Sequence, residues 1–155
     1  MLTGKKVLVI GLAKSGKAAV RLLKKLNATI TVNEFQEASK IPEYQQYLDD
    51  GIEMITGGHP DELFERDFDF VIKNPGINYH KPFILRLKER NIPVYTEIEL
   101  AYQVAKKQHY IGVTGTNGKT TTVTLIDKIL KGQYQNVHLA GNVGMPLCDI
   151  AVSYT

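Results

Sequence analysis

A glycine-rich turn separates a strand-like segment from a helix-like segment in the second half of the chain. The octapeptide Thr-Gly-Thr-Asn-Gly-Lys-Thr-Thr occupies residues 114–121, after the strand-like residues 109–113 and at the start of the helix-like residues 120–131. Such a turn directs backbone N–H groups and a helix N-terminus at one point, which suits a polyphosphate. In this kind of loop the lysine reaches the β- and γ-phosphates and the following hydroxyl joins a Mg2+ shell. We therefore predict a phosphate-binding loop, with Lys119 and Thr120 as catalytic candidates and Thr120 as the metal-binding candidate.

The loop departs from the strict Walker pattern at one position. That pattern has glycine five residues before Gly118, where this chain has Val113. The predicted ATP-binding residues are those of the loop itself: Gly115, Thr116, Asn117, Gly118, Lys119, Thr120 and Thr121. We expect a variant ATP site that takes Mg2+ together with the nucleotide.

Strands and helices alternate along the rest of the chain. Short apolar or β-branched runs predict strands at residues 7–10, 29–32, 52–56, 69–72 and 93–95. Apolar spacing and helix-opening residues predict helices at residues 19–26, 43–48, 82–87 and 96–105. Ser15 is placed to cap the first helix, and Thr96 with Glu99 has the form of a capping box before the last. The alternation predicts an α/β fold with a doubly wound, Rossmann-like parallel sheet.

The alternation closes near residue 107 and restarts at the phosphate loop. We predict a Rossmann-like domain over residues 1–107 and the truncated start of a P-loop α/β domain over residues 108–155. Within the second part, residues 109–113 and 137–140 are expected to be strands, and a helix is expected from Leu147 onwards. Domains usually have about 100–150 residues. We therefore expect the chain to hold one complete domain and the opening of a second.

A second glycine-rich loop follows the first predicted strand. Residues 11–16 read Gly-Leu-Ala-Lys-Ser-Gly and are similar to the G-x-G-x-x-G dinucleotide fingerprint, except that Ala13 replaces its second glycine. This loop can present N–H groups and the Ser15 hydroxyl to a phosphate, with Lys14 adding charge. The alternative is that Gly11 and Gly16 only permit tight packing of strand against helix.

Polar and turn-forming residues follow two other predicted strands. Asn33 and Glu34 end the second strand, where such folds often recognise a ribose or base. Asn74, Pro75, Gly76 and Ile77 form a turn after the fourth strand, which taken alone is more often just a turn. Because ligands bind at the carboxyl edge of open α/β sheets, both segments are candidates for a nucleotide site.

Composition excludes several classes of protein. The net charge of +3 is small and dispersed, and no basic run is interleaved with aromatic residues, which argues against a nucleic-acid partner. No apolar stretch approaches the length of a membrane span, and we expect no signal peptide before the first strand. The single Cys148 fits a reducing cytoplasm and is expected to be a small core residue. The four histidines, His59, His80, His109 and His138, share no metal-ligand spacing and are expected at the surface or at strand ends.

Five motifs, in this order, resemble those of the Mur ligases: residues 11–16, 74–77, 97–100, 114–121 and 141–144. The phosphate loop is shared with sister ligases and approximately with folylpolyglutamate synthases. The N-terminal motifs look most like the member that adds D-glutamate. The resemblance implies an ATP-dependent ligase of three domains that serves peptidoglycan precursor synthesis in the cytoplasm. ATP would phosphorylate the carboxylate of UDP-N-acetylmuramoyl-L-alanine, and the amine of D-glutamate would attack the acyl phosphate.

The resemblance also implies roles for individual residues. Lys14 and Ser15 would lie at the UDP phosphates, and Asn33 and Glu34 near the ribose or uracil. Asn142 would contact the muramoyl substrate. The uracil pocket would be lined by Asn74, Pro75, Gly76 and Ile77. This sequence departs from the family at Asn33, where Asp is frequent, and at Asn74, where Ser is frequent.

Other parts of the family enzyme have no counterpart in these residues. The resemblance places a carbamylated lysine, a magnesium-binding glutamate, a catalytic histidine and the D-glutamate site beyond them. We therefore expect this polypeptide to bind UDP without catalysing ligation alone, and the parent enzyme to be a monomer.

Three alternatives stay open. The first is another Mur ligase or a folylpolyglutamate synthase, and the second is a non-catalytic UDP-sugar-binding module that never hydrolyses ATP. The third is an NAD-dependent oxidoreductase, against which Ala13 and the second phosphate loop argue.

Overall fold

The computed structural model of the protein describes residues 2–155, which contain one five-stranded parallel sheet. Its strands are β1 (Lys6–Ile10), β2 (Thr29–Glu34), β3 (Glu53–Thr56), β4 (Phe70–Lys73) and β5 (Val94–Tyr95). They lie in the order β3-β2-β1-β4-β5, and every neighbouring pair is parallel. The predicted α/β, Rossmann-like sheet is confirmed, and each of its five strands falls where the sequence predicts one.

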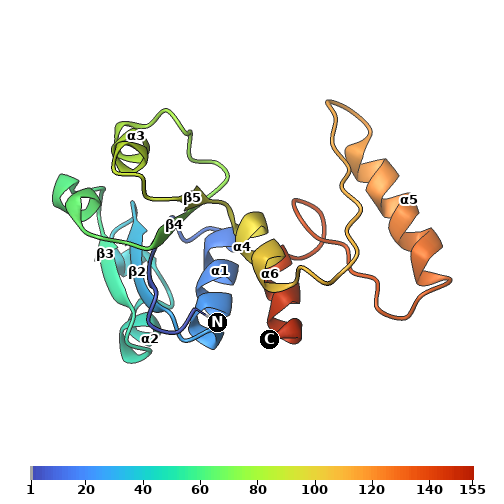
Figure 1. The fold of residues 1–155 in the computed structure, drawn as a ribbon, viewed down its shortest axis with the longest axis horizontal. Coiled ribbons are helices and arrows are strands. Elements are labelled where there is room, and N and C mark those ends of the chain that lie inside the picture. Colours follow the sequence, from blue (N-terminus) through green and yellow to red (C-terminus); the bar gives the residue numbers. More distant parts are fainter. Residues whose placement is uncertain (1) are drawn as a thin grey trace.

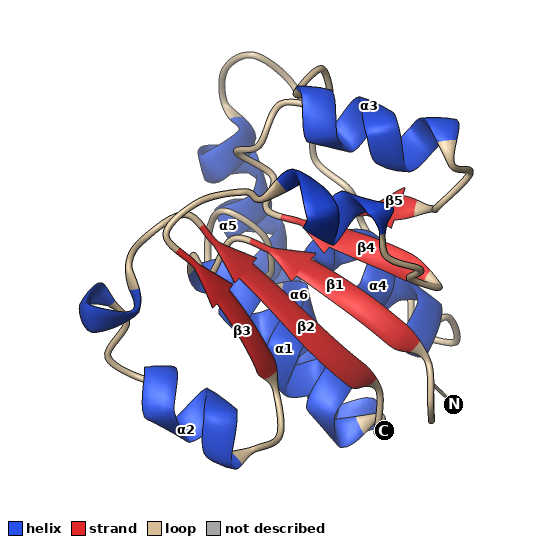
Figure 2. Ribbon diagram, turned by 90° about the vertical axis from the view of Figure 1, so that its left-hand side faces the viewer, coloured by secondary structure: helices blue, strands red, loops and turns tan. Residues whose placement is uncertain are grey.

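Helices cover both faces of this sheet. The described residues form the helices α1 (Lys14–Lys25), α2 (Tyr44–Asp49), α3 (Pro82–Glu89), α4 (Glu97–Val104), α5 (Lys119–Lys131) and α6 (Leu147–Ala151), of which α5 stands away from the sheet (Figure 1). Short 3-10 turns occupy Ala38–Lys40, Asp61–Glu65 and Val152–Tyr154. Figure 2 shows α1, α4 and α6 behind the sheet and α3 on the opposite face. The predicted capping box of Thr96 and Glu99 is present at the start of α4.

The two faces of the sheet each bury an apolar core. Successive side chains of a strand point to opposite faces. Accordingly, Val7 and Val9 of β1 join the cluster beneath α1, α4 and α6, and Leu8 and Ile10 join the cluster beneath α3. All four side chains are fully buried. A strand that is apolar on both sides is typical of a parallel sheet with helices on each face.

Two strand predictions and one cap prediction are wrong. Residues 109–113 and 137–140 form no strand in the structure, apart from an isolated bridge between Ala140 and Met145. A strand needs a hydrogen-bonded neighbour, and within residues 2–155 neither segment lies beside another strand. Ser15 is not the helix cap, because α1 already begins at Lys14 and Ala13 occupies the cap position.

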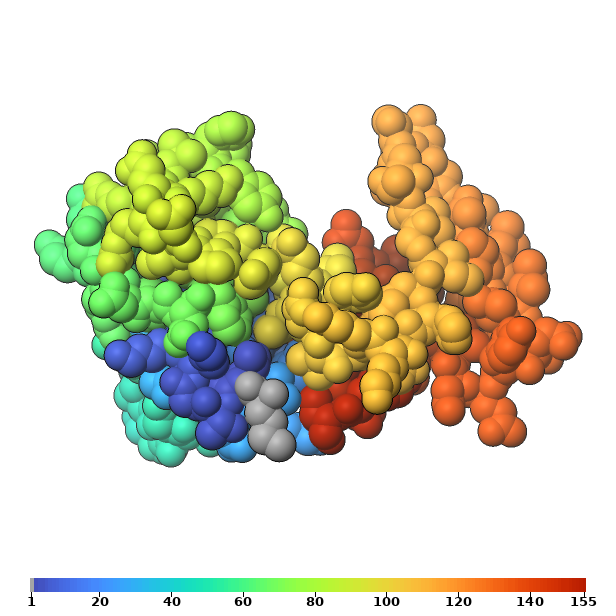
Figure 3. All heavy atoms as spheres, viewed as in Figure 1, coloured from blue at the N-terminus to red at the C-terminus, as the bar shows by residue number. Residues whose placement is uncertain are grey.

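The segment that follows α4 extends away from the sheet and then returns to it. Figures 1 and 3 show residues near 110–135, in orange, standing to one side of the blue and green part of the molecule. Helix α5 has no buried residue. Helix α6, in contrast, packs against α1 and α4 and buries Cys148, Ile150 and Ala151. The expectation that Cys148 is a core residue is confirmed.

Candidate nucleotide sites

A cavity of about 350 Å³ opens at the carboxyl ends of the strands. Helix α1 leads from β1 to β2 on one side, and β4 lies on the other side of β1. The direction in which successive strands are added to the sheet therefore reverses at β1, and open α/β sheets bind ligands at such a reversal. The lining residues are Gly11, Leu12, Ala13, Lys17, Glu34, Phe35, Gln36, Lys40, Ile41, Pro42, His59, Asn74 and Ile77.

Gly16 allows α1 to begin directly against the loop after β1. It is buried, and a Cβ atom built there would lie 1.9 Å from the carbonyl oxygen of Gly11. No side chain larger than hydrogen fits at that distance. The first turn of α1 also has no acidic residue and no side-chain cap. The N-terminus of α1 therefore lies beside the cavity, and its N–H groups have no side-chain partner. Such a helix end favours binding of an anion.

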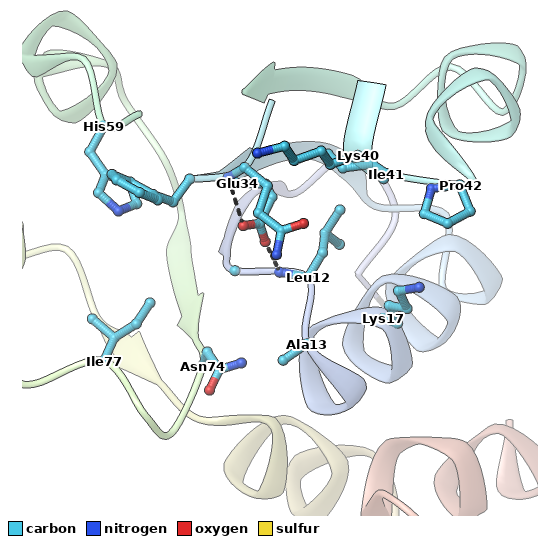
Figure 4. A pocket seen from close by; sticks show the side chains of 13 residues that line it. Leu12, Ala13, Lys17, Glu34, Lys40, Ile41, Pro42, His59, Asn74 and Ile77 are labelled. Carbon is cyan, nitrogen blue, oxygen red and sulfur yellow. Dashed lines mark hydrogen bonds between the residues drawn. The ribbon is translucent and has the colours of Figure 1, made fainter. Parts of the chain in front are cut away.

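Glu34 ties the loop after β1 to the end of β2. Its Oε2 atom accepts a hydrogen bond from the Leu12 N–H at 2.5 Å, and its Oε1 atom accepts one from the Gln36 N–H at 3.1 Å. Figure 4 shows this carboxylate among the other lining side chains, with dashed lines for its hydrogen bonds. A carboxylate has about four lone-pair positions. Glu34 therefore keeps acceptor capacity for a ligand hydroxyl while it holds the loop.

Asn33 is fully buried, and its side chain holds the segment after β3. Its Nδ2 atom donates to the carbonyl oxygens of Ile55 at 3.2 Å and Gly58 at 2.8 Å, and its Oδ1 atom lies 2.5 Å from Nδ1 of His59. Because the amide nitrogen already serves two carbonyls, Oδ1 must accept, and His59 Nδ1 carries the proton. Asn33 thus fixes the tautomer of a ring that lines the cavity.

His59 stands half-buried between two aromatic rings. The ring centroids of Phe35 and Phe83 are 5.7 Å and 4.7 Å from that of His59. Burial lowers the pKa of His59, and Lys81 acts in the same direction, while the Glu34 carboxylate opposes them. The imidazole is therefore neutral at neutral pH, with Nε2 as an acceptor.

The turn after β4 is held by a buried lysine. Lys73 is 1% exposed, and its Nζ atom donates to the carbonyl oxygen of Ile77 at 2.9 Å. The ammonium also lies 3.9 Å from the centre of the Tyr79 ring. Burial lowers the pKa of Lys73, while Glu99 opposes this. Asn74 closes the turn by accepting the Gly76 N–H through Oδ1 at 2.9 Å.

Lys14 and Ser15, which the sequence predicts at the UDP phosphates, are not among the residues that line the cavity. Lys14 donates to the carbonyl oxygen of Gly144 at 2.9 Å, and Ser15 lies half-buried in the first turn of α1. Lys17 and Lys40 line the cavity instead. The Lys17 ammonium lies 2.7 Å from a carboxylate oxygen of Glu43, and this contact lowers the pKa of Glu43.

The phosphate loop lies apart from this cavity and is exposed. Residues 114–122 are all solvent-exposed, and helix α5 begins directly after Gly118. The Lys119 ammonium donates to the carbonyl oxygen of Gly115 and, at 3.2 Å, to that of Thr116. The first turn of α5 has no acidic residue and no side-chain cap. Its N–H groups and Lys119 therefore fit a polyphosphate, and the exposed Thr120 hydroxyl fits one position of a Mg2+ shell.

The structure brings together part of the predicted site. Glu34, Asn74 and Ile77 line the cavity, and Pro75 and Gly76 are exposed in the same turn. Asn142 is exposed in a separate turn at residues 141–144. The sequence interpretation missed the lining residues Lys17, Phe35, Gln36, Lys40, Ile41, Pro42 and His59. Position offered a signal for His59, since it follows β3 at the same sheet edge as the other loops.

Two further features concern the described residues as a whole. Within residues 2–155, no group of three or more His, Cys, Asp or Glu side chains is placed to hold a metal ion. In that same part of the chain, every helix is too short or too polar to cross a membrane.

Two protein-family models match the chain. Residues 5–96 match the Mur ligase MurD-like N-terminal domain, and residues 113–151 match the Mur ligase middle domain. A curated relative, UDP-N-acetylmuramoylalanine--D-glutamate ligase of Streptococcus thermophilus, is 49% identical over 154 residues, which is 99% of this chain. The chain spans only 34% of that relative's length.

Solved structures show the same fold. A murein peptide ligase from Psychrobacter arcticus has a TM-score of 0.59 at 21% identity, over 90% of this chain and 30% of its own. UDP-N-acetylmuramate-alanine ligase from Thermotoga maritima has a TM-score of 0.52 at 27% identity, over 82% of this chain and 29% of its own. At 21% identity, the first likeness supports the fold alone.

Proposed function

The chain belongs to the Mur ligase family, and on that premise we propose that it is the nucleotide-binding part of a ligase that adds D-glutamate to UDP-N-acetylmuramoyl-L-alanine. The observation that carries the proposal is the cavity between β1, β2 and β4, whose lining comes from the part of the chain that matches the MurD-like model. A volume near 350 Å³ lies within the roughly 300–1,000 Å³ range of small-molecule sites. The fold is shared by many functions, so the assignment rests on the site and the relatives rather than on the sheet.

The cavity side chains have the chemistry that a uridine diphosphate needs. Glu34 would accept ribose hydroxyls through its remaining lone pairs, and the turn of Asn74 and Ile77 would bound the base. Lys17 and the uncapped first turn of α1 would meet the phosphates, with Lys14 and Ser15 at the same helix end. Asn33 would act through His59, whose tautomer it sets.

The phosphate loop would hold ATP with Mg2+. Lys119 would leave the carbonyl oxygens of its own loop and donate to phosphate oxygens, which are stronger acceptors. Thr120 would supply one oxygen to the metal ion. When bound, ATP supplies the phosphoryl group that activates a carboxylate for amide formation. We propose that the domain boundary lies near residue 107, that the protein acts in the cytoplasm as a monomer, and that the ligation needs residues outside this chain.

Calorimetric titration tests the proposal. We expect saturable binding of UDP and of UDP-N-acetylmuramoyl-L-alanine, and no binding of NAD. Binding of NAD without UDP would instead support an oxidoreductase and overturn the proposal. The matched variant is Glu34→Gln, which keeps the size of the side chain but replaces one acceptor with a donor. We expect this variant to bind UDP more weakly than the wild type.

A further inference from the structure

Helix α6 packs against α1 and α4, although it lies far from both in sequence. Cys148 and Ala151 belong to the same apolar cluster as Ala19 and Leu22 of α1 and Ala101 of α4. Figure 1 shows α6 beside α4 and next to α1. This contact joins the part of the chain after the phosphate loop to the part that forms the cavity.

Glu97 is the buried polar side chain at this contact. It is the first residue of α4 and is 3% exposed. Its Oε1 atom accepts the Cys148 N–H at 2.5 Å, and its carbonyl oxygen accepts from the Cys148 thiol at 3.3 Å. Helix α6 has no side-chain cap of its own, so Glu97 supplies the acceptor for one of its unpaired first-turn N–H groups. Burying a carboxylate is costly unless it is hydrogen-bonded, which makes this contact specific.

The contacts around Glu97 are more exposed. Arg21 donates through Nε and Nη2 to the Asp149 carboxylate at 2.8 Å and 2.9 Å, and Lys25 donates to the Val152 carbonyl oxygen at 3.0 Å. The Arg21–Asp149 pair is bidentate, but the Arg21 side chain stays about half exposed to solvent, which weakens the pair relative to a buried contact. Glu97 is therefore the contact on which the specific docking of α6 depends most.

The turn that carries Asn142 leads directly into α6. A Cβ atom at Gly144 would lie 2.2 Å from the carbonyl oxygen of Leu139, so this turn is tight. The Met145 N–H donates to that same oxygen at 3.2 Å, and the Gly141 N–H donates to the Met145 carbonyl oxygen at 3.0 Å. These bonds hold residues 139–145 in one turn directly before α6, and Lys14 of α1 also donates to the Gly144 carbonyl oxygen of that turn. The docking of α6 therefore helps to place Asn142 relative to the cavity.

We propose that Glu97 is a positioning residue, which holds α6 on α4 through the Cys148 N–H and thereby places Asn142 against the part of the ligand beyond UDP. This inference rests on the proposed function. It predicts that Glu97 matters for the muramoyl end of the ligand and not for the UDP end, which binds in the cavity.

The reactivity of the Cys148 thiol can be used to measure the docking of α6. Cys148 is the single cysteine, and it is fully buried. Burial raises the pKa of its thiol, so the docked form should react slowly with a thiol reagent. Undocking of α6 would expose the thiol, and the labelling rate would follow the open population.

The experiment compares the wild-type chain with Glu97→Ala, Glu97→Asp, Glu97→Gln and the exposed control Glu89→Ala. Labelling of Cys148 by Ellman's reagent measures docking, and calorimetry gives the Kd for UDP and for UDP-N-acetylmuramoyl-L-alanine. Leaving the Cys148 N–H without an acceptor should raise the labelling rate of Glu97→Ala about tenfold or more. Its affinity for the muramoyl ligand should fall to that for UDP, with UDP affinity unchanged. Glu97→Gln keeps an acceptor and should restore both, and Glu89→Ala should match the wild type.

Glu97→Asp withdraws the carboxylate by one methylene and should show the same two effects as alanine. It replaces Glu97→Ala as the deciding variant if the alanine variant loses UDP binding through misfolding. Faster labelling with undiminished muramoyl affinity would overturn the proposal, as would unchanged labelling or a glutamine variant that restores neither property. A wild-type chain that binds UDP but gains nothing from the muramoyl group would refute the positioning of Asn142 alone. A wild-type chain that binds neither ligand would refute the proposed function as well.

Discussion

Replacing Gly16 with alanine should destabilise the protein and distort the cavity together. The added Cβ atom would lie 1.9 Å from the Gly11 carbonyl oxygen, whereas real Cβ atoms essentially never approach closer than 3.0 Å. Helix α1 and the loop after β1 must therefore separate by about 1 Å, the difference between these two distances. The obstacle is backbone rather than a flexible side chain, so the strain cannot be relieved by a rotamer change.

The magnitude follows from two opposing effects. Overpacking of a buried site costs up to about 3 kcal/mol, and this backbone collision belongs at that end of the range. Alanine is favoured over glycine inside a helix by up to ~1 kcal/mol, which offsets part of the cost. The net loss of about 2 kcal/mol should lower the Tm by roughly 4–8 °C in a chain of this size. Because Gly11 lines the cavity, the affinity for UDP should fall as well.

Thermal unfolding followed by circular dichroism, together with UDP titration, measures both effects. Gly112→Ala is the matched control, because nothing lies within 4 Å of a Cβ atom at that position. A surface substitution of this kind should change stability by no more than about 0.5 kcal/mol. A Gly16→Ala protein that unfolds within about 2 °C of the wild type would refute the packing argument.

Three further predictions concern separate side chains. Burial lowers the pKa of His59, so the unfolded state binds more protons than the folded state. The free energy of unfolding should therefore fall as the pH drops below the ordinary imidazole pKa of about 6.5, and it should fall less in His59→Gln. Equal pH dependence of the two proteins in urea titrations would contradict this. Lys73→Met removes the ammonium that holds the Ile77 carbonyl oxygen in the turn after β4. Since hydrogen bonds to charged groups contribute about 1.5–3 kcal/mol, the affinity for UDP measured by calorimetry should fall at least several-fold. An unchanged Kd would show that UDP binding does not depend on this hold on the turn. Lys119→Ala should weaken binding of MgATP and leave UDP affinity unchanged, and a loss of both in fluorescence titrations would show that the two sites are not separate.

The sheet could be predicted from the sequence because its strands carry strong local signals. Residues 7–10 are apolar on both faces and end at a glycine, and residues 29–32 are all β-branched. Residues 109–113 carry a similar signal but form no strand. A local pattern states a preference for extended backbone, whereas a strand also needs a neighbour, and none lies beside that segment among residues 2–155.

The cavity could be predicted only where its residues follow strands directly. Glu34 ends β2 and Asn74 follows β4, so the rule for the carboxyl edge of a sheet finds both. Lys17 and Lys40 reach the cavity from α1 and from the 3-10 turn Ala38–Lys40, and only the folded backbone brings them there. The sequence predicts Asn33 as a ligand contact because it lies at the same edge of the sheet. Its side chain instead donates hydrogen bonds to the segment after β3 and does not line the cavity, which sequence position alone could not reveal.

The central claim is that the cavity beside β1, β2 and β4 is where the UDP end of the ligand binds. The most direct test is an NMR titration of the 15N-labelled chain with UDP, because backbone amides report the location of binding. The amides of Leu12, Gln36 and Gly76, which bond to Glu34 and Asn74 in the free protein, should shift and saturate together. Shifts confined to residues 115–121, with the cavity amides unmoved, would place the nucleotide on the phosphate loop and contradict the claim.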